Sequence, residues 1–282
     1  MAINLKKIDE LFRSDAVELF CPYCGTKTYC LVNLTLCSNC ESIISMTRSA
    51  VLKKDSLTVQ SLEKINALTD LDYTSEENFE SAISIYDELI SSKGDIGYIY
   101  AKSLMLIKYS NYIISKINYE GHGFMEENYV YSQKSMNLVS NARLLFYKLI
   151  SSAESNVKNN INSFNDAYFI FLAYIKLKKL KSAQYALNSL KKFKEDDNLN
   201  ISYAELIFYI NMADFSSAIL LSEKLLNNGV IHLNILFYYA FAMFHTNKFK
   251  QSNKVIGILQ NYIKNESINN LKEDILIKST LY

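Results

Sequence analysis

The sequence contains little that would interrupt a helix. Only one of its 282 residues is proline, Pro22, and only seven are glycine. Because proline removes a backbone donor and glycine weakens helices, their scarcity leaves nearly the whole chain free to form helix. The longest apolar runs reach about ten residues, roughly half of what a membrane-spanning helix needs. We therefore expect a largely helical protein with no membrane span.

The signatures of common enzymes are also missing. The three histidines, His122, His232 and His245, are far apart, and none belongs to an H-E-x-x-H pattern. No serine lies in a G-x-S-x-G turn, and no G-x-G-x-x-G loop is present to bind a nucleotide. The sequence therefore predicts a protein that is not an enzyme.

The charges nearly cancel, with 30 basic and 29 acidic side chains. A net charge of +1 gives no global attraction to nucleic acid or membranes. Locally the charges separate: residues 70–95 hold eight acids and one lysine, and residues 176–194 hold seven lysines and no acid. These runs are either solvated helix faces or a polarity that steers a charged partner or stacks copies head to tail. The N-terminus is charged and lacks the features of a signal peptide, so we expect a cytoplasmic protein.

All five cysteines lie between positions 21 and 40. Cys21 and Cys24 form one C-x-x-C pair, and Cys37 and Cys40 form a second pair after twelve intervening residues. Two such pairs can close one tetrahedral site of four thiolates, which predicts a structural Zn²⁺. A glutaredoxin-type redox motif is a less favoured alternative, because strand-like residues and a second pair follow the first. A rubredoxin-like iron site would use the same four ligands, but the second pair lacks the proline and glycine that are usual there. Cys30 lies outside both pairs, and we expect it to be a small buried residue.

The residues around the pairs alternate as in a small hairpin. Residues 17–20 lead into the first pair, the stretch 26–32 places Thr28 and Cys30 on one face, and residues 34–36 lead into the second pair. This pattern is typical of a zinc ribbon, which we assign, with an amphipathic helix over residues 4–13, to a module spanning residues 1–55. The module is loosely similar to the zinc-binding segment of ribosomal-RNA guanine methyltransferases, and that resemblance implies an RNA-facing ancestry.

Beyond the module an internal repeat emerges. Five segments share a bulky apolar residue, a small residue three positions later and a leucine seven further on: Phe79-Ala82-Leu89, Val139-Ala142-Leu149, Leu180-Ala183-Leu190, Phe215-Ala218-Leu225 and Phe249-Ser252-Leu259. The spacing and the segment at residues 78–90 resemble the tetratricopeptide repeat (TPR). The resemblance implies an all-α, TPR-like α-solenoid of about five helix pairs over residues 56–282, with a glycine-containing loop at 118–127 and a closing helix at 269–278.

A second set of residues recurs with the same spacing. In TPR arrays the early positions of each first helix line a concave groove. The matching residues here are amides and aromatic rings: Asn165, Tyr168, Asn200, Tyr203, Asn234, Phe237 and Phe241. The asparagines are either helix N-caps or a row of amides that binds an extended peptide, with the rings forming side-chain pockets.

These patterns favour a non-enzymatic adaptor or regulator that holds a peptide or protein segment in this groove, with zinc in a structural role. The alternative is a nucleic-acid-associated regulator whose ribbon contacts RNA or DNA while the repeats sense a peptide or mediate assembly. Residues 1–55 carry a net charge of +1, which becomes −1 with one Zn²⁺ and four thiolates. Phosphate binding needs several cations on one face, so nucleic acid is the less favoured partner.

Overall fold

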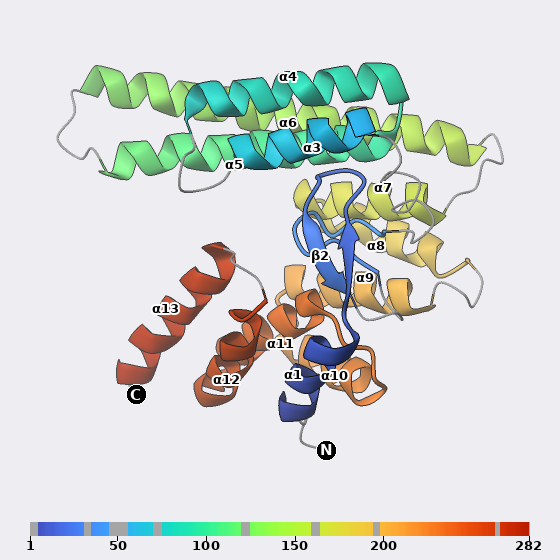
Figure 1. Cartoon of the computed structure of the whole chain (residues 1–282), viewed down its shortest axis with the longest axis vertical. Helices are drawn as coiled ribbons and strands as arrows, with labels where there is room; N and C mark the ends of the chain where they lie inside the picture. The colour runs from blue at the N-terminus through green and yellow to red at the C-terminus, as the bar shows by residue number, and fades with distance from the viewer. Residues whose placement is uncertain are drawn as a thin grey trace. The chain divides into compact units, whose positions relative to one another are not determined.

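The structure, a computed structural model, describes residues 5–30, 35–44, 56–69, 75–119, 125–158, 164–193, 198–262 and 266–281. Most of these residues are α-helical, and the only sheet among them has two strands, β1 and β2. The prediction of an all-α protein with one small sheet is therefore confirmed (Figure 1).

The chain divides into two compact units. Unit 1 comprises Met1–Leu19, Lys27–Ser45 and Leu180–Tyr282, and unit 2 comprises Phe20–Thr26 and Met46–Lys179. A division of the helical part after Lys179 was not expected from the sequence. The domain boundary predicted at residue 55 lies outside the described residues.

Unit 2 is built from five helices that pack in chain order. They are α3 (Ser56–Leu68), α4 (Glu76–Lys93), α5 (Ile96–Tyr119), α6 (Met125–Lys158) and α7 (Phe164–Lys176). Each helix packs against the next, and α5 also contacts α7. Figure 1 shows the long helices α4, α5 and α6 running side by side. The small residues Ala82 and Ala142 are at most 1% exposed, as the repeat pattern requires.

The loop predicted at residues 118–127 is wrong at both ends. Helix α5 continues through Asn118 and Tyr119, and α6 already begins at Met125, which leaves only residues 120–124 outside the described helices. The helix-weakening glycines Gly121 and Gly123 both fall in that short gap, whereas the residues on either side tolerate helix.

Lysines from neighbouring helices form ion pairs with Glu76 and Glu80, two acids of the run on α4. Glu76 pairs with Lys116 of α5 at 3.2 Å and with Lys134 of α6 at 2.5 Å. Lys134 also lies 3.2 Å from Glu80. Burial disfavours the charge on Lys134, but its hydrogen bonds to Glu76, Tyr109 and Glu80 outweigh that effect and raise its pKa. Glu76 and Glu80 therefore contribute to the packing of unit 2, whereas Glu77 and Glu88 of the same helix are exposed.

Unit 1 contains the N-terminal helix, the sheet and the last six helices. They are α1 (Leu5–Asp15), β1 (Val17–Phe20, whose last residue belongs to unit 2), β2 (Lys27–Cys30), α8 (Leu180–Leu190), α9 (Asn198–Asn211), α10 (Phe215–Asn227), α11 (Leu233–His245), α12 (Phe249–Leu259) and α13 (Glu266–Leu281). Helices α8 to α13 each pack against the next in the chain, and α1 packs against α12. The closing helix predicted at 269–278 is confirmed and is longer than expected.

The last three segments of the repeat predicted from the sequence match the helix boundaries, whereas Val139 of the second segment lies in the interior of α6. Helices α8, α10 and α12 begin at Leu180, Phe215 and Phe249, the bulky first residues of the last three segments. The small residues that follow them are fully buried: Ala183, Ala218 and Ser252. A small residue at such a position lets two helices approach closely.

The three turns that precede these helices share one geometry. Each contains a residue with left-handed backbone, namely Lys178, Ala213 and Asn247, with φ of 57°, 57° and 62°. In each turn the next residue donates its backbone N–H to the carbonyl five positions back, at 2.9 to 3.0 Å. The turns thus repeat with the same spacing of 35 and 34 residues as the sequence pattern.

Candidate metal centre

Four cysteine side chains converge at one site. The sulfur atoms of Cys21, Cys24, Cys37 and Cys40 all lie within 4.8 Å of one another, and all four residues are buried. A tetrahedral zinc with Zn–S bonds of about 2.3 Å places its sulfurs about 3.8 Å apart, so this cluster fits such an ion with a small contraction. No other group of three or more potential metal ligands occurs among the described residues.

The first cysteine turn packs tightly against helices of unit 2. Its backbone is closed by a hydrogen bond from Gly25 N–H to the Cys21 carbonyl at 3.0 Å. Gly25 has φ of 71°, and a Cβ there would lie 2.8 Å from the Cβ of Leu62 on α3. Glycine is therefore required both by the backbone conformation and by the contact with α3.

Tyr23 anchors the same turn. Its ring is 1% exposed and packs edge-on against Tyr98 and Phe169, with centroids 6.0 and 5.3 Å away. Gly97 on α5 makes room for it, because a Cβ at that position would lie 2.1 Å from the ring. Tyr23, between the two cysteines of this pair, therefore serves packing in addition to the metal binding proposed for its neighbours.

The second cysteine turn has the same local form. Glu41 N–H donates to the Cys37 carbonyl at 3.1 Å, and the N–H groups of Asn39 and Cys40 each lie 3.4 Å from the Cys37 sulfur. Hydrogen bonds to sulfur favour the thiolate, which is the form that binds metal. Glu41 has φ of 63°, so it adopts the left-handed conformation that Gly25 adopts in the first turn.

Side chains from α9 and α11 of unit 1 hold this second turn. The Asn234 amide donates to the Cys37 carbonyl at 3.2 Å and to the Tyr203 hydroxyl at 3.0 Å. The Tyr238 hydroxyl donates to the Glu41 carboxylate, and the Tyr203 hydroxyl lies 3.5 Å from the same oxygen. The turn is thus bound by the helices through its backbone and through a buried carboxylate.

His232 supports the segment that leads into the second turn, in which Leu36 forms an isolated β-bridge with Ile43. Its Nδ1 accepts the backbone N–H of Asn234 at 3.1 Å, so the ring proton is on Nε2, which donates to the Leu36 carbonyl at 3.2 Å. Burial lowers the pKa of His232 to about 4, although the bond to Leu36 opposes this shift. The Cys30 sulfur lies 3.6 Å from Nε2 and is 1% exposed. The prediction that Cys30 is a buried residue outside the metal group is therefore confirmed.

The residues predicted to line a groove are not equally accessible. In unit 2, Tyr168 is 1% exposed, whereas Asn165 is partly exposed. In unit 1, Tyr203 and Asn234 are buried at 0% and 6%. Those two side chains contact the chain's own second cysteine turn, so they do not form part of an open surface.

The alternative role of the asparagines as N-caps is wrong for Asn234. It is the second residue of α11, and His232 caps that helix instead. Asn165 and Asn200 likewise lie inside α7 and α9, one and two residues after the helix start. His232 and Tyr238 were not predicted as site residues, because no local pattern links them to cysteines that are distant in the sequence. Glu41 directly follows Cys40, but nothing in the C-x-x-C spacing indicates a role for it.

Phe237 and Phe241 remain partly exposed at the far end of the row. They belong to an aromatic cluster with Phe215 and His245, in which the Phe215 and His245 rings stack 4.5 Å apart. We call this cluster of four rings the aromatic patch, and it contains two predicted groove residues, Phe237 and Phe241, that do not contact the cysteine turn and remain partly exposed.

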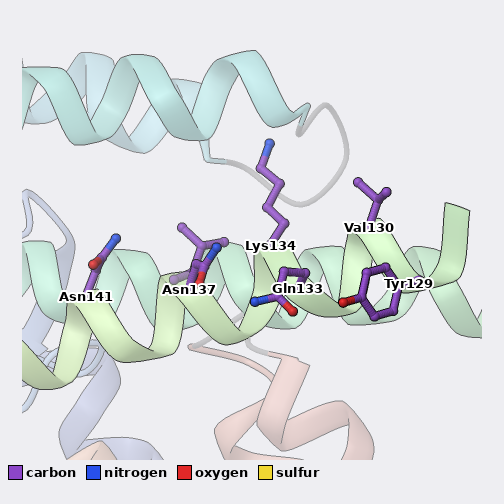
Figure 2. Close-up of a pocket in the computed structure, with 7 residues that line it drawn as sticks. Tyr129, Val130, Gln133, Lys134, Asn137 and Asn141 are labelled. Carbon is purple, nitrogen blue, oxygen red and sulfur yellow. The ribbon is translucent and has the colours of Figure 1, made fainter. Parts of the chain in front are cut away.

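A shallow hollow of about 380 Å³ lies on α6 in unit 2 (Figure 2). It is lined by uncharged side chains and one lysine: Tyr129, Val130, Gln133, Lys134, Asn137, Leu138 and Asn141. Lys134 is engaged with Glu76, so the hollow presents amides and apolar groups but no arrangement of nucleophile and base.

Comparison with protein-family models, with curated proteins and with solved structures gives no match to this chain. Among the described residues, no helix is long and apolar enough to cross a membrane. The four-cysteine cluster and the repeated helix pairs are therefore the features on which a function can be proposed.

Proposed function

We propose that this protein is a TPR-like helical-repeat binding protein in which a structural zinc ion, held by Cys21, Cys24, Cys37 and Cys40, fixes a zinc ribbon. The observation that carries the proposal is the buried cluster of four sulfurs. Zinc suits it because four thiolates in tetrahedral reach leave no open position for substrate, which is typical of structural sites. Such a site stabilises a segment that is too small to fold on its own core.

The repeated turns support the TPR-like assignment. Similar left-handed turns precede α8, α10 and α12, and a fully buried small residue lies in each of these helices, with a spacing of 35 and 34 residues. Arrays of such helix pairs commonly bind peptides or proteins, because stacking creates an extended surface. The aromatic patch supplies the large, partly exposed rings that dominate binding energy at protein interfaces.

A display library of peptides, selected on the zinc-loaded chain, tests the binding role. Affinities of the selected peptides are then measured for the parent, for Phe237→Ala and Phe241→Ala, and for the exposed ribbon variant Lys27→Ala. We expect each aromatic truncation to weaken binding by more than about 1 kcal/mol and Lys27→Ala to have no effect. Selected peptides that bind all four proteins equally would contradict the patch as the binding surface.

The nucleic-acid alternative is tested on the same proteins with random-sequence RNA and duplex DNA. Phosphate-driven binding weakens steeply as salt rises, and a lysine that contacts phosphate reduces that slope when removed. Tight RNA binding with a steep salt dependence that Lys27→Ala reduces, together with no effect of Phe237→Ala, would replace the peptide-binding proposal with the alternative.

A further inference from the structure

We infer that the metal site extends into the repeat helices: Asn234 and Tyr238 of α11, with Tyr203 of α9, are positioning residues that hold the second cysteine turn in its metal-binding form. This inference rests on the zinc site proposed above. It assigns a role to side chains as far as 197 positions from the cysteines that they support. All the contacts involved lie within unit 1.

The first observation is the amide of Asn234. Both of its N–H groups are used, one on the carbonyl of the ligand residue Cys37 and one on the Tyr203 hydroxyl. A carbonyl accepts but does not donate, so the contact with Cys37 fixes the orientation of the amide. Because Asn234 is 6% exposed, water does not readily replace a lost partner at the Cys37 carbonyl.

The second observation is the backbone of Glu41. The residue after each C-x-x-C pair has positive φ, and the first turn has Gly25 there, which adopts this conformation without strain. The second turn has glutamate, which is disfavoured in that conformation. The Glu41 side chain is buried, and its carboxylate accepts a hydrogen bond from Tyr238. The turn alone would favour glycine, so the position of glutamate is explained by the contact with the helices.

The two observations have a common consequence. If the helices stabilise the turn in its metal-binding form, metal binding must stabilise the contact with α11 by the same factor. Residues that orient metal ligands typically change metal affinity by about 10- to 100-fold when they are removed. We therefore expect zinc affinity and protection of α11 from hydrogen exchange to change together.

The test compares two neighbouring tyrosines on the same helix. Tyr238→Phe removes the hydroxyl that binds Glu41, whereas Tyr239→Phe removes a hydroxyl that binds Glu223 of α10 at 3.0 Å and does not touch the turn. Zinc affinity of the reduced, full-length chain is measured by competition with a chromophoric chelator. We expect Tyr238→Phe and Asn234→Leu to bind zinc about tenfold or more weakly, and Tyr239→Phe to bind like the parent.

The change in zinc affinity caused by Glu41→Gly distinguishes a turn that holds its own conformation from a turn that the helices hold through the Glu41 carboxylate. An autonomous turn would bind zinc more tightly with glycine, because the left-handed backbone is relaxed. A turn that is held through the carboxylate binds zinc more weakly with glycine. In a background that carries both Tyr203→Phe and Tyr238→Phe the weakening should largely disappear, because both hydroxyls that contact the carboxylate are already gone.

The spectrum of the cobalt-substituted proteins shows whether the four thiolates still bind in the variants. Thiolate coordination that is retained with weakened affinity, and faster hydrogen exchange in α11 without metal than with it, support the inference. Variants that bind zinc as tightly as the parent, or tighter binding by Glu41→Gly, overturn it while leaving the zinc site intact. A parent chain that binds no zinc overturns the zinc site itself.

Discussion

A single methyl group at Gly97 should displace the first cysteine turn. In the middle of a helix alanine is more favourable than glycine by about 0.5 to 1 kcal/mol, and in the first turn of α5, where Gly97 lies, any such gain is at most of that size. A Cβ at position 97, however, would lie 2.1 Å from two ring carbons of Tyr23, far inside any normal contact. Since Tyr23 is 1% exposed and packed by Tyr98 and Phe169, its ring has no free space to enter. We expect Gly97→Ala to lower the free energy of unfolding by about 1 to 3 kcal/mol, the usual effect of overpacking.

Gly257→Ala is the matched control, because α12 also contains a glycine but no atom lies within 4 Å of a Cβ built there. It should stabilise the chain by about 0.5 to 1 kcal/mol. Urea unfolding followed by far-ultraviolet circular dichroism measures both changes. In a Tyr23→Ala background, Gly97→Ala should no longer destabilise, because the clashing ring is gone. If Gly97→Ala stabilises the parent as Gly257→Ala does, the described packing of Tyr23 is wrong.

Two further predictions concern unit 1. Ala218→Leu adds three carbons at a fully buried position and should lower the free energy of unfolding, measured in urea, by about 1 to 3 kcal/mol. Ser216→Leu, on the exposed face of α10, should change it by less than about 0.5 kcal/mol. Equal effects of the two substitutions would refute the repeat packing. His232 has a pKa of about 4 when folded and about 6.5 when unfolded, so only the unfolded chain gains the proton between these values, and stability falls as pH is lowered from 6.5 to 4. Over that pH range the free energy of unfolding of the parent should fall by about 3 kcal/mol more than that of His232→Asn, because asparagine keeps a capping side chain but does not titrate. Equal decreases in the two proteins would contradict a buried neutral imidazole.

The periodic parts of the fold could be predicted because their signals are local. Small residues at Ala183, Ala218 and Ser252 mark close helix contacts, and the bulky residues before them mark the helix starts. The alternation from Lys27 to Cys30 likewise matches the strand, in which Thr28 and Cys30 are buried while Lys27 and Tyr29 are exposed. In each case a period of the sequence is the same as a period of the backbone.

The surroundings of the cysteines could not be predicted in this way. The C-x-x-C spacing identifies the four sulfurs, but it does not identify Asn234 or Tyr238, which reach the second turn only through the tertiary fold. One of the two roles predicted for Asn234 was to bind the backbone of a peptide; it does bind a backbone carbonyl, but that carbonyl belongs to Cys37 of the same chain. A sequence pattern can indicate the chemistry of an amide without indicating which segment it meets.

The measurement that tests the account most directly is the metal content of the chain purified without chelator under reducing conditions. Elemental analysis should find one zinc per chain, and X-ray absorption should show four sulfur neighbours at about 2.3 Å. Cys37→Ser should lose most of this zinc, whereas Cys30→Ser, which changes a buried cysteine outside the cluster, should retain it. A parent chain without stoichiometric zinc, or full zinc content in Cys37→Ser, would contradict the four-thiolate centre.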